Sequence, residues 1–203
     1  MSNPASSSKA ERTRTFIIEK TADVFNKKGY AGTSLSDLTG VTGLTKGSIY
    51  GNFESKEEVA LAVFDYNYER IVRITQEEIL KADTFHARLM VYARVYKNMI
   101  LDPLHPGGCP ILNTAIEADD TNPQLREKAA KAIDSWQQRI SWIINDGIAA
   151  GEFKADVPVS RVALSIIALI EGAVMIAKVT GDPARMDEIM RTVATLIEEM
   201  KSK

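Results

Sequence analysis

The sequence is short of the residues that most enzymes use for covalent or metal chemistry. It has one cysteine, Cys109, and two histidines, His86 and His105, among 203 residues. His105 and Cys109 have the spacing of two ligands on one helix face, but prolines and glycines lie between them and no fourth ligand is evident. As a nucleophilic pair they lack a third member. A phosphate-binding glycine loop of either common kind is also missing. Catalysis is therefore disfavoured, and no metal or cofactor is expected.

The single cysteine excludes an intramolecular disulfide and fits a reducing compartment. Long apolar runs are also missing. The most apolar stretch, residues 162–177, is interrupted by Glu171 and is short for a membrane span. Residues 1–8 are polar, without an apolar segment of signal-peptide length, and we expect them to form a flexible arm. These features predict a cytoplasmic protein with no membrane partner.

Net charge is small, at −2, which by itself argues against non-specific binding to nucleic acid. Its distribution is uneven, however. Residues 1–56 hold eight Lys/Arg and five Asp/Glu, a balance of +3, so the remaining 147 residues carry −5. The basic end is where nucleic-acid binding is expected. A hydrophobic content of 45% is ample for a buried core.

Residues 44–53, Leu-Thr-Lys-Gly-Ser-Ile-Tyr-Gly-Asn-Phe, have the pattern of a short amphipathic helix. Ile49 and Phe53 are four residues apart and would point inward. The remaining positions present hydroxyls, an amide, a phenol and one lysine, which suit base edges and phosphate oxygens. Such a helix would fit the major groove of DNA.

A second short helix is predicted just before it, over residues 34–40. Ser34 is a good N-cap, and Asp37 completes a capping box three residues later. Gly43 follows, where a tight link between two crossed helices needs a residue that tolerates positive φ. The two helices and this glycine turn predict a helix-turn-helix motif.

The order and spacing of these residues resemble the N-terminal DNA-binding domain of the TetR family of transcriptional regulators. The resemblance covers roughly residues 11–61 and is carried by Thr33-Ser34-Leu35-Ser36-Asp37-Leu38, Gly43-Leu44-Thr45-Lys46-Gly47-Ser48-Ile49-Tyr50, Asn52-Phe53 and Ser55-Lys56-Glu57-Glu58. The chain departs from the family at Gly51, where a larger polar residue is common, so a phosphate contact there is lost or is made by Asn52. The resemblance implies an all-α fold of about nine helices.

Helical patterns with clear start signals cover the rest of the chain. Helices are predicted over residues 9–28, 55–81, 84–101 and 110–118, from Pro123 to near Gly151, and from the proline turns at Pro158 and Pro183 to the end. We find no alternating stretch that would form a sheet. The expected organisation is an arm over residues 1–8, a helix-turn-helix domain over 9–54, and a helical ligand-binding and dimerisation domain over 55–203.

These patterns give three sets of candidate residues. Contacts to bases, backbone or groove rim are expected from Thr33, Ser34, Ser36, Thr45, Lys46, Gly47, Ser48, Tyr50, Gly51, Asn52 and Lys56. A cavity for a small, largely apolar ligand is expected around Phe85, Tyr92, Tyr96, Met99, Cys109, Trp136 and Glu171, although such residues also suit a plain core. A homodimer interface is expected in the last two helices, at Ile166, Ile170, Val174, Met190, Val193 and Ile197.

Two readings of Cys109 stay open from the sequence. It precedes Pro110 at the start of a predicted helix, where the helix dipole would stabilise a thiolate that senses an oxidant or electrophile. Alternatively, it is an unreactive buried cysteine.

The resemblance implies a dimeric repressor that binds a palindromic operator and is released by a small molecule. The competing classes are a helical small-molecule-binding protein or enzyme without DNA binding, and a helical adaptor for another protein. An adaptor would leave the polar face of residues 45–52 unexplained.

Overall fold

The computed structural model describes residues 8–101 and 107–202. Within these ranges the chain is all helical, as predicted, and forms nine α-helices with no named strand. The helices are α1 (Lys9–Gly32), α2 (Leu35–Thr42), α3 (Lys46–Tyr50), α4 (Lys56–Leu80), α5 (Phe85–Leu101), α6 (Pro110–Ala118), α7 (Pro123–Ala149), α8 (Val159–Thr180) and α9 (Ala184–Glu198). Seven of the eight residues of the expected arm and His105 lie outside the described ranges.

Local capping explains where most helices begin. The hydroxyls of Ser8 and Ser34 each accept the backbone N–H three residues later, and the Glu11 and Asp37 carboxylates accept the N–H groups of Ser8 and Ser34 in return. The side chains of Ser55 and Asn122 accept the backbone N–H groups of Glu58 and Leu125 and so cap α4 and α7, without a return bond. Each cap satisfies a backbone donor that has no partner inside the helix. The predicted starts of α2, α4 and α7 are therefore confirmed, and α6 begins at Pro110 as predicted, without a side-chain cap.

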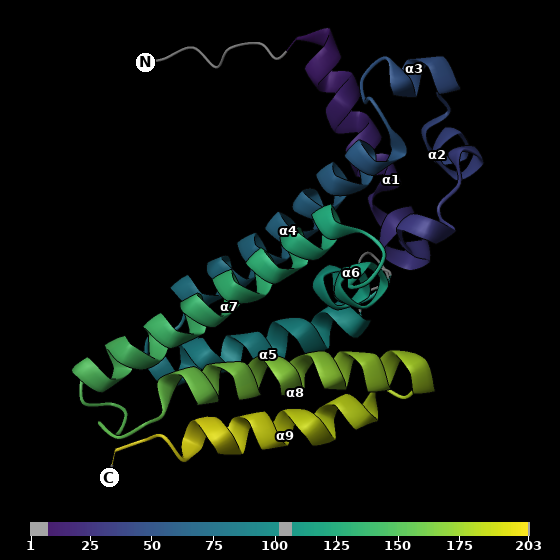
Figure 1. Cartoon of the computed structure of the whole chain (residues 1–203). Helices are drawn as coiled ribbons and strands as arrows, with labels where there is room; N and C mark the ends of the chain where they lie inside the picture. The colour runs from purple at the N-terminus through teal and green to yellow at the C-terminus, as the bar shows by residue number, and fades with distance from the viewer. Residues whose placement is uncertain (1–7, 102–106, 203) are drawn as a thin grey trace, which may run out of the picture.

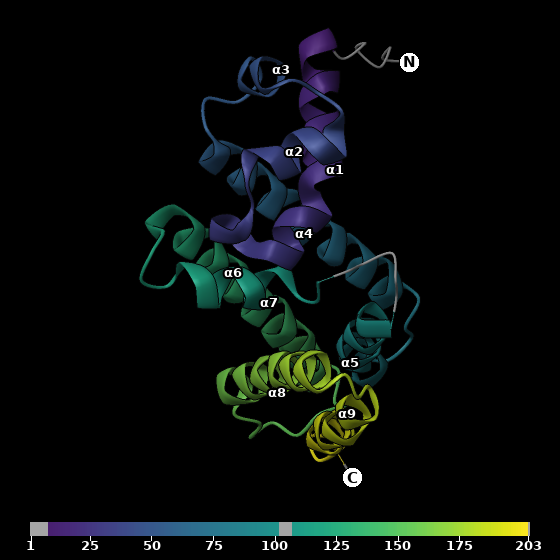
Figure 2. The same ribbon diagram turned by 90° about the vertical axis from the view of Figure 1, so that its right-hand side faces the viewer.

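Figure 1 shows α1, α2 and α3 gathered at one end of the molecule and α8 and α9 at the other, with α4 leading from the first group toward the second. The quarter turn of Figure 2 shows the same order. Two hydrophobic clusters match this arrangement. The smaller one joins α1, α2 and α3 to the first turns of α4, as far as Val63, and the larger one contains the rest of α4 with α5 to α9. The cores thus divide within α4, not at its first residue.

Helix α8 is the one helix in the described ranges that is long and apolar enough to cross a membrane by length and composition. It packs extensively against α9 and also contacts α5 and α7, and Figure 1 shows it lying between α5 and α9. Ile166, Ile170 and Val174 are fully buried along it. Its apolar character is that of a core helix.

Candidate functional site

Helix α3 presents a polar face and anchors itself by apolar side chains. Ile49 and Phe53 are buried in the smaller cluster, as predicted. Thr45 is the N-cap, and its hydroxyl accepts the Ser48 N–H at 3.2 Å. Thr45, Lys46 and Gly47 are exposed, whereas Ser48 and Tyr50 are half-buried. The first turn of α3 is therefore available to a ligand as large as DNA.

The turn before α3 has the predicted geometry. Gly43 is left-handed, with φ 68°, and caps α2 by donating to the Thr39 carbonyl. Asp37 closes the capping box of α2 and accepts an ion pair from Lys28 at 2.6 Å. The bond from Lys28 and those from Ser34 lower the pKa of the Asp37 carboxyl to about 2. Ser34 and Ser36 remain exposed at the start of α2.

Two residues expected to contact DNA are used inside the protein. Thr33 is 1% exposed, and its hydroxyl donates to the Gly29 carbonyl at 2.6 Å. The Lys56 ammonium donates to the carbonyls of Tyr30 and Thr33 at 2.8 and 3.0 Å and lies 4.3 Å from the centre of the Tyr30 ring. The predicted side-chain contact is corrected for Thr33, whose buried hydroxyl closes the end of α1. Lys56 joins the start of α4 to the end of α1, and its phosphate contact stays a prediction.

The side chains at the end of α3 are less accessible than those at its beginning. The Asn52 amide donates to the Ser48 carbonyl at 2.8 Å, so it turns back on its own helix. Gly51 is exposed, and a Cβ there would lie 3.2 Å from the Gly47 carbonyl oxygen. Gly47 has open space where a side chain would be, with only Thr45 near it. The Thr45 end is accordingly the more accessible part of the helix.

Sequence reasoning did not find the residue that holds the end of α3. The Arg14 guanidinium donates to the Asn52 carbonyl at 2.6 Å and to the Glu58 carboxylate at 2.7 Å, and lies 4.0 Å from the centre of the Phe53 ring. It therefore joins α1, the turn after α3 and α4. The partners are 38 and 44 residues away, so no local pattern indicates this role.

A cavity of about 250 Å³ lies in the C-terminal part, among α4, α5, α6 and α7. The residues around it are Tyr68, Ile71, Val72, Thr75, Gln76, Ile79, Tyr92, Tyr96, Ile111, Trp136, Arg139, Trp142, Ile143 and Asp146. Tyr92, Tyr96 and Trp136 were predicted at a ligand site. Phe85, Met99, Cys109 and Glu171 were predicted there too, but they do not line this cavity. Phe85 lies at the first turn of α5, Cys109 and Glu171 pair elsewhere in the core, and Met99 lines a different pocket beside Val95 and Asn98.

Three polar atoms of this cavity wall are buried without a hydrogen-bond partner among the described residues. They are the hydroxyls of Tyr68 and Tyr92 and the indole nitrogen of Trp136. Such groups are uncommon in folded proteins, because burying a polar atom without a partner is costly. Burial raises the pKa of the Tyr92 hydroxyl, and the nearby charge of Arg139 acts in the opposite direction.

Cys109 and Glu171 form a buried pair behind the cavity. The Cys109 Sγ donates to the Glu171 Oε1 at 2.9 Å, and Glu171 Oε2 is inaccessible and without a partner in the described ranges. Burial raises the pKa of the Glu171 carboxyl to about 7. Burial and the neighbouring carboxyl raise the pKa of the Cys109 thiol well above its usual value. Of the two readings of Cys109, this burial agrees with the unreactive buried cysteine and gives no support to a thiolate at the start of α6.

The predicted dimer residues are not on the surface. Ile166, Ile170, Val174, Met190, Val193 and Ile197 are all buried in the larger core. The apolar stripes of α8 and α9 that predicted a dimer interface therefore face the core of their own subunit. The outward side of α8 has its own apolar stripe, spaced three or four residues apart, which consists of Leu164, Ala168, Gly172, Met175 and Val179.

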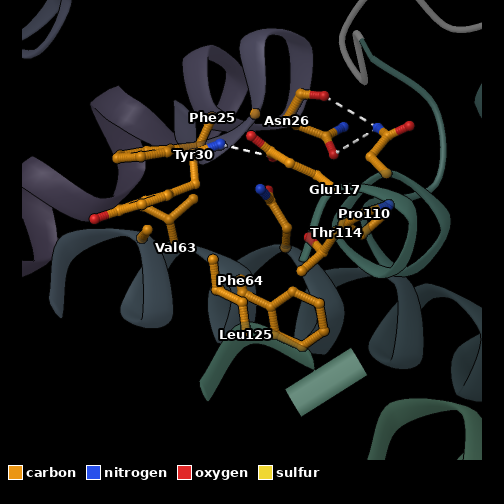
Figure 3. A pocket seen from close by; sticks show the side chains of 13 residues that line it. Phe25, Asn26, Tyr30, Val63, Phe64, Pro110, Thr114, Glu117 and Leu125 are labelled. Carbon is orange, nitrogen blue, oxygen red and sulfur yellow. Dashed lines mark hydrogen bonds between the residues drawn. The ribbon is translucent and has the colours of Figure 1, made fainter. Parts of the chain in front are cut away.

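Polar side chains join the two parts beside apolar ones such as Phe25 and Leu125 (Figure 3). The Glu117 carboxylate of α6 accepts the backbone N–H groups of Tyr30 and Ala31 at 2.8 and 2.7 Å. It lies where a side chain on Gly29 would be, and Gly29 also has φ 71°. Beside it, the Asn113 amide donates to the Asn26 carbonyl at 3.0 Å. The positive φ favours glycine at position 29, and a side chain there would also displace the Glu117 carboxylate from its two backbone bonds.

These features define a class: an all-helical protein with a helix-turn-helix motif at one end and a hollow helical domain at the other. No cluster of metal-ligating side chains is found in the described residues. Residues 17–63 match the family model "Bacterial regulatory proteins, tetR family", and residues 86–193 match "Tetracyclin repressor-like, C-terminal domain". The chain belongs to the TetR family of transcriptional regulators, whose members bind DNA and small-molecule effectors, act as dimers and are not enzymes.

Named relatives agree with this assignment. A TetR-family regulator from Cytophaga hutchinsonii is 47% identical, with a TM-score of 0.92 over 98% of this chain and 99% of that one. A second, from Chloroflexus aurantiacus, is 40% identical, with a TM-score of 0.90 over 95% and 98%. The repressor DhaR of Mycobacterium sp. strain GP1 is 25% identical over 89% of both chains.

Proposed function

We propose that this protein is a dimeric, cytoplasmic repressor that binds a palindromic operator through α3 and leaves the DNA when a small, largely apolar molecule enters the cavity. The observation that carries the proposal is the exposed polar first turn of α3, which includes Thr45 and Lys46 and is held from behind by Ile49 and Phe53. The name of DhaR, a repressor, supports the negative sign of regulation.

Lys46 and Tyr50 are the proposed base-reading side chains, and Thr45 and Ser48 add hydroxyls beside them. Lys46 is exposed and forms no ion pair with any described residue. Gly47 exposes the backbone of α3, which allows close approach to the groove. Ser34 and Ser36, exposed at the start of α2, are the proposed phosphate contacts, since helix N-termini favour anions.

Dimerisation through the outward face of α8 accounts for its apolar stripe. Val179 is 81% exposed, and Leu164 and Met175 are also exposed. Gly172, with open space around it, lets a second helix approach closely. Pairing these stripes, with α9 alongside, would form a four-helix interface. Two copies of α3 about 34 Å apart would then read two half-sites one DNA turn apart.

Helix α4 provides the mechanical connection for release. Its first turns pack against α1 and α3 through Val59 and Val63, and the Asn67 amide donates to the Ala22 carbonyl at 3.2 Å. Its later turns line the cavity from Tyr68 to Ile79. A ligand that moves the cavity half of α4 would move α3 as well, and thereby change the fit to two half-sites.

The first test is fluorescence anisotropy with DNA that flanks the coding region, with scrambled DNA as the control, at two salt concentrations. Preferential binding that weakens with salt is expected. The variants are Lys46→Ala and Tyr50→Ala, and Lys131→Ala on α7 is the matched control for loss of one charge. We expect Lys46→Ala to relax sequence preference and Tyr50→Ala to weaken specific binding without unfolding. Unchanged operator affinity in both would remove α3 from the proposal.

A further inference from the structure

The cavity among α4, α5, α6 and α7 combines aromatic side chains with unused hydrogen-bond donors. The rings of Tyr96 and Trp136 stack at 4.8 Å with 6° between their planes. Ile71, Ile79 and Ile143 add apolar surface. At about 250 Å³ the cavity exceeds the ~150 Å³ apolar cavity that holds a benzene molecule in another protein. Its size and its aromatic lining suit a molecule of one or two aromatic rings.

The polar atoms of the wall indicate the chemistry of the ligand's other end. The Trp136 indole nitrogen can only donate, and the buried hydroxyls of Tyr68 and Tyr92 have donors without a described acceptor. The Arg139 guanidinium lies 5.9 Å from the centre of the Tyr68 ring and forms no ion pair with any described carboxylate. All these groups are satisfied by an acceptor, and Arg139 is best satisfied by a negative one.

One acidic residue, Asp146, also lines the cavity, and its distance from Arg139 decides where an anionic group can bind. Asp146 follows Arg139 by seven residues on α7, which places it about 10 Å further along the helix. The exposed Trp142 lies between them in sequence. The two charges therefore mark different ends of the cavity, and an anionic group would sit at the Arg139 end.

We propose that this cavity binds a flat aromatic carboxylic acid, with the carboxylate held by Arg139 and the hydroxyls of Tyr68 and Tyr92, and the rings lying against Trp136. This inference rests on the proposed function only in treating the cavity as the effector site. Two otherwise unsatisfied polar atoms, the hydroxyls of Tyr68 and Tyr92, gain an acceptor when such a ligand binds.

Isothermal titration calorimetry without DNA tests it, using 2-naphthoate and benzoate as probes. The neutral amide of each acid has the same shape and serves as the matched ligand. We expect at least one acid to bind about tenfold or more tightly than its amide, because a charge-assisted bond is stronger than a neutral one. In Arg139→Gln this preference should disappear. Arg126→Gln, an exposed position on the same helix, should keep it.

Tyr92→Phe separates a binding role from a structural one. Removing an unpaired buried hydroxyl should leave the melting temperature of the unliganded protein unchanged or higher, while acid binding weakens several-fold. No binding of either acid, equal binding of acid and amide, or a preference that survives Arg139→Gln would each overturn the inference. Acid binding without release of operator DNA would instead refute the release mechanism and leave the ligand class standing.

Discussion

The buried carboxyl of Glu171 should make the stability of this protein fall as pH rises through neutrality. Glu171 lies on α8 and accepts one hydrogen bond, from the Cys109 thiol at 2.9 Å. The titratable groups that face it are Cys109 and Tyr96, and the pKa values of both are raised, chiefly by burial. Neither supplies a positive charge, so the ionised carboxylate is poorly compensated. The informative change is Glu171→Gln, which keeps an oxygen acceptor for Cys109 and cannot ionise.

The size of the effect follows from the two pKa values of this carboxyl. Burial raises its pKa from 4.5 to about 7 in the folded protein. The folded state thus binds the proton more tightly, and its advantage is fully present below pH 4.5 and lost as pH rises through 7. The difference of about 2.5 pH units, at ~1.4 kcal/mol each, amounts to about 3 kcal/mol. Between pH 4.5 and 8 the wild type should lose about this much more stability than Glu171→Gln.

Urea unfolding followed by circular dichroism, at fixed protein concentration and at several pH values, measures the difference. Concentration must be fixed because a dimer's apparent stability depends on it. Glu188→Gln, at an exposed position on α9, is the control and should follow the wild type. Parallel stability curves for wild type and Glu171→Gln across this range would mean that Glu171 ionises with an ordinary pKa, and the buried-carboxyl reasoning would fail.

Three further substitutions test other parts of the structure. Gly147→Ala should destabilise the C-terminal part by about 1–3 kcal/mol, because the new Cβ would collide with the Phe153 ring, and thermal unfolding would detect the shift. Arg14→Met should cost about 1–2 kcal/mol and weaken operator binding, because the Asn52 carbonyl loses its charged donor; unaltered DNA affinity would contradict this anchoring role. Met175→Glu on the α8 stripe should convert a dimer to monomers in analytical ultracentrifugation, and an unchanged mass would exclude that face.

Helix starts could be predicted where the capping residue is local, and not where it comes from elsewhere in the chain. Ser34 and Asn122 are adjacent to the helices they cap, so their patterns were readable. Glu152, in contrast, accepts the backbone N–H groups of Phe85 and His86 at 2.9 and 2.7 Å and so caps α5 from 66 or 67 residues away. Glu117 does the same for the turn after Gly29. Such carboxylates look like ordinary surface charges in the sequence.

The same limit applies to the cavity and the dimer face. Tyr92, Tyr96 and Trp136 could be named because aromatic residues on core helices are few. Arg139 was not, since its role depends on Tyr68 in a different helix. On α8, apolar residues on most sides hide which side faces out. The most regular apolar stripe of α8, which contains Ile166, Ile170 and Val174, packs inside the subunit. A subunit core buries more apolar surface than an interface along one side of a helix, so the core-facing stripe is the more pronounced.

The net positive charge of the N-terminal part does not mean that each of its basic side chains contacts DNA. Residues 1–56 carry a balance of +3, and pairing inside the protein does not change that sum, so its long-range attraction for DNA persists. Arg14, Lys28 and Lys56 are nevertheless engaged with Glu58, Asp37 and backbone carbonyls. Their side chains stabilise the motif. Under the proposed function we therefore expect contact along the α2–α3 motif from Lys46, from hydroxyl groups and from the backbone N–H groups at helix starts.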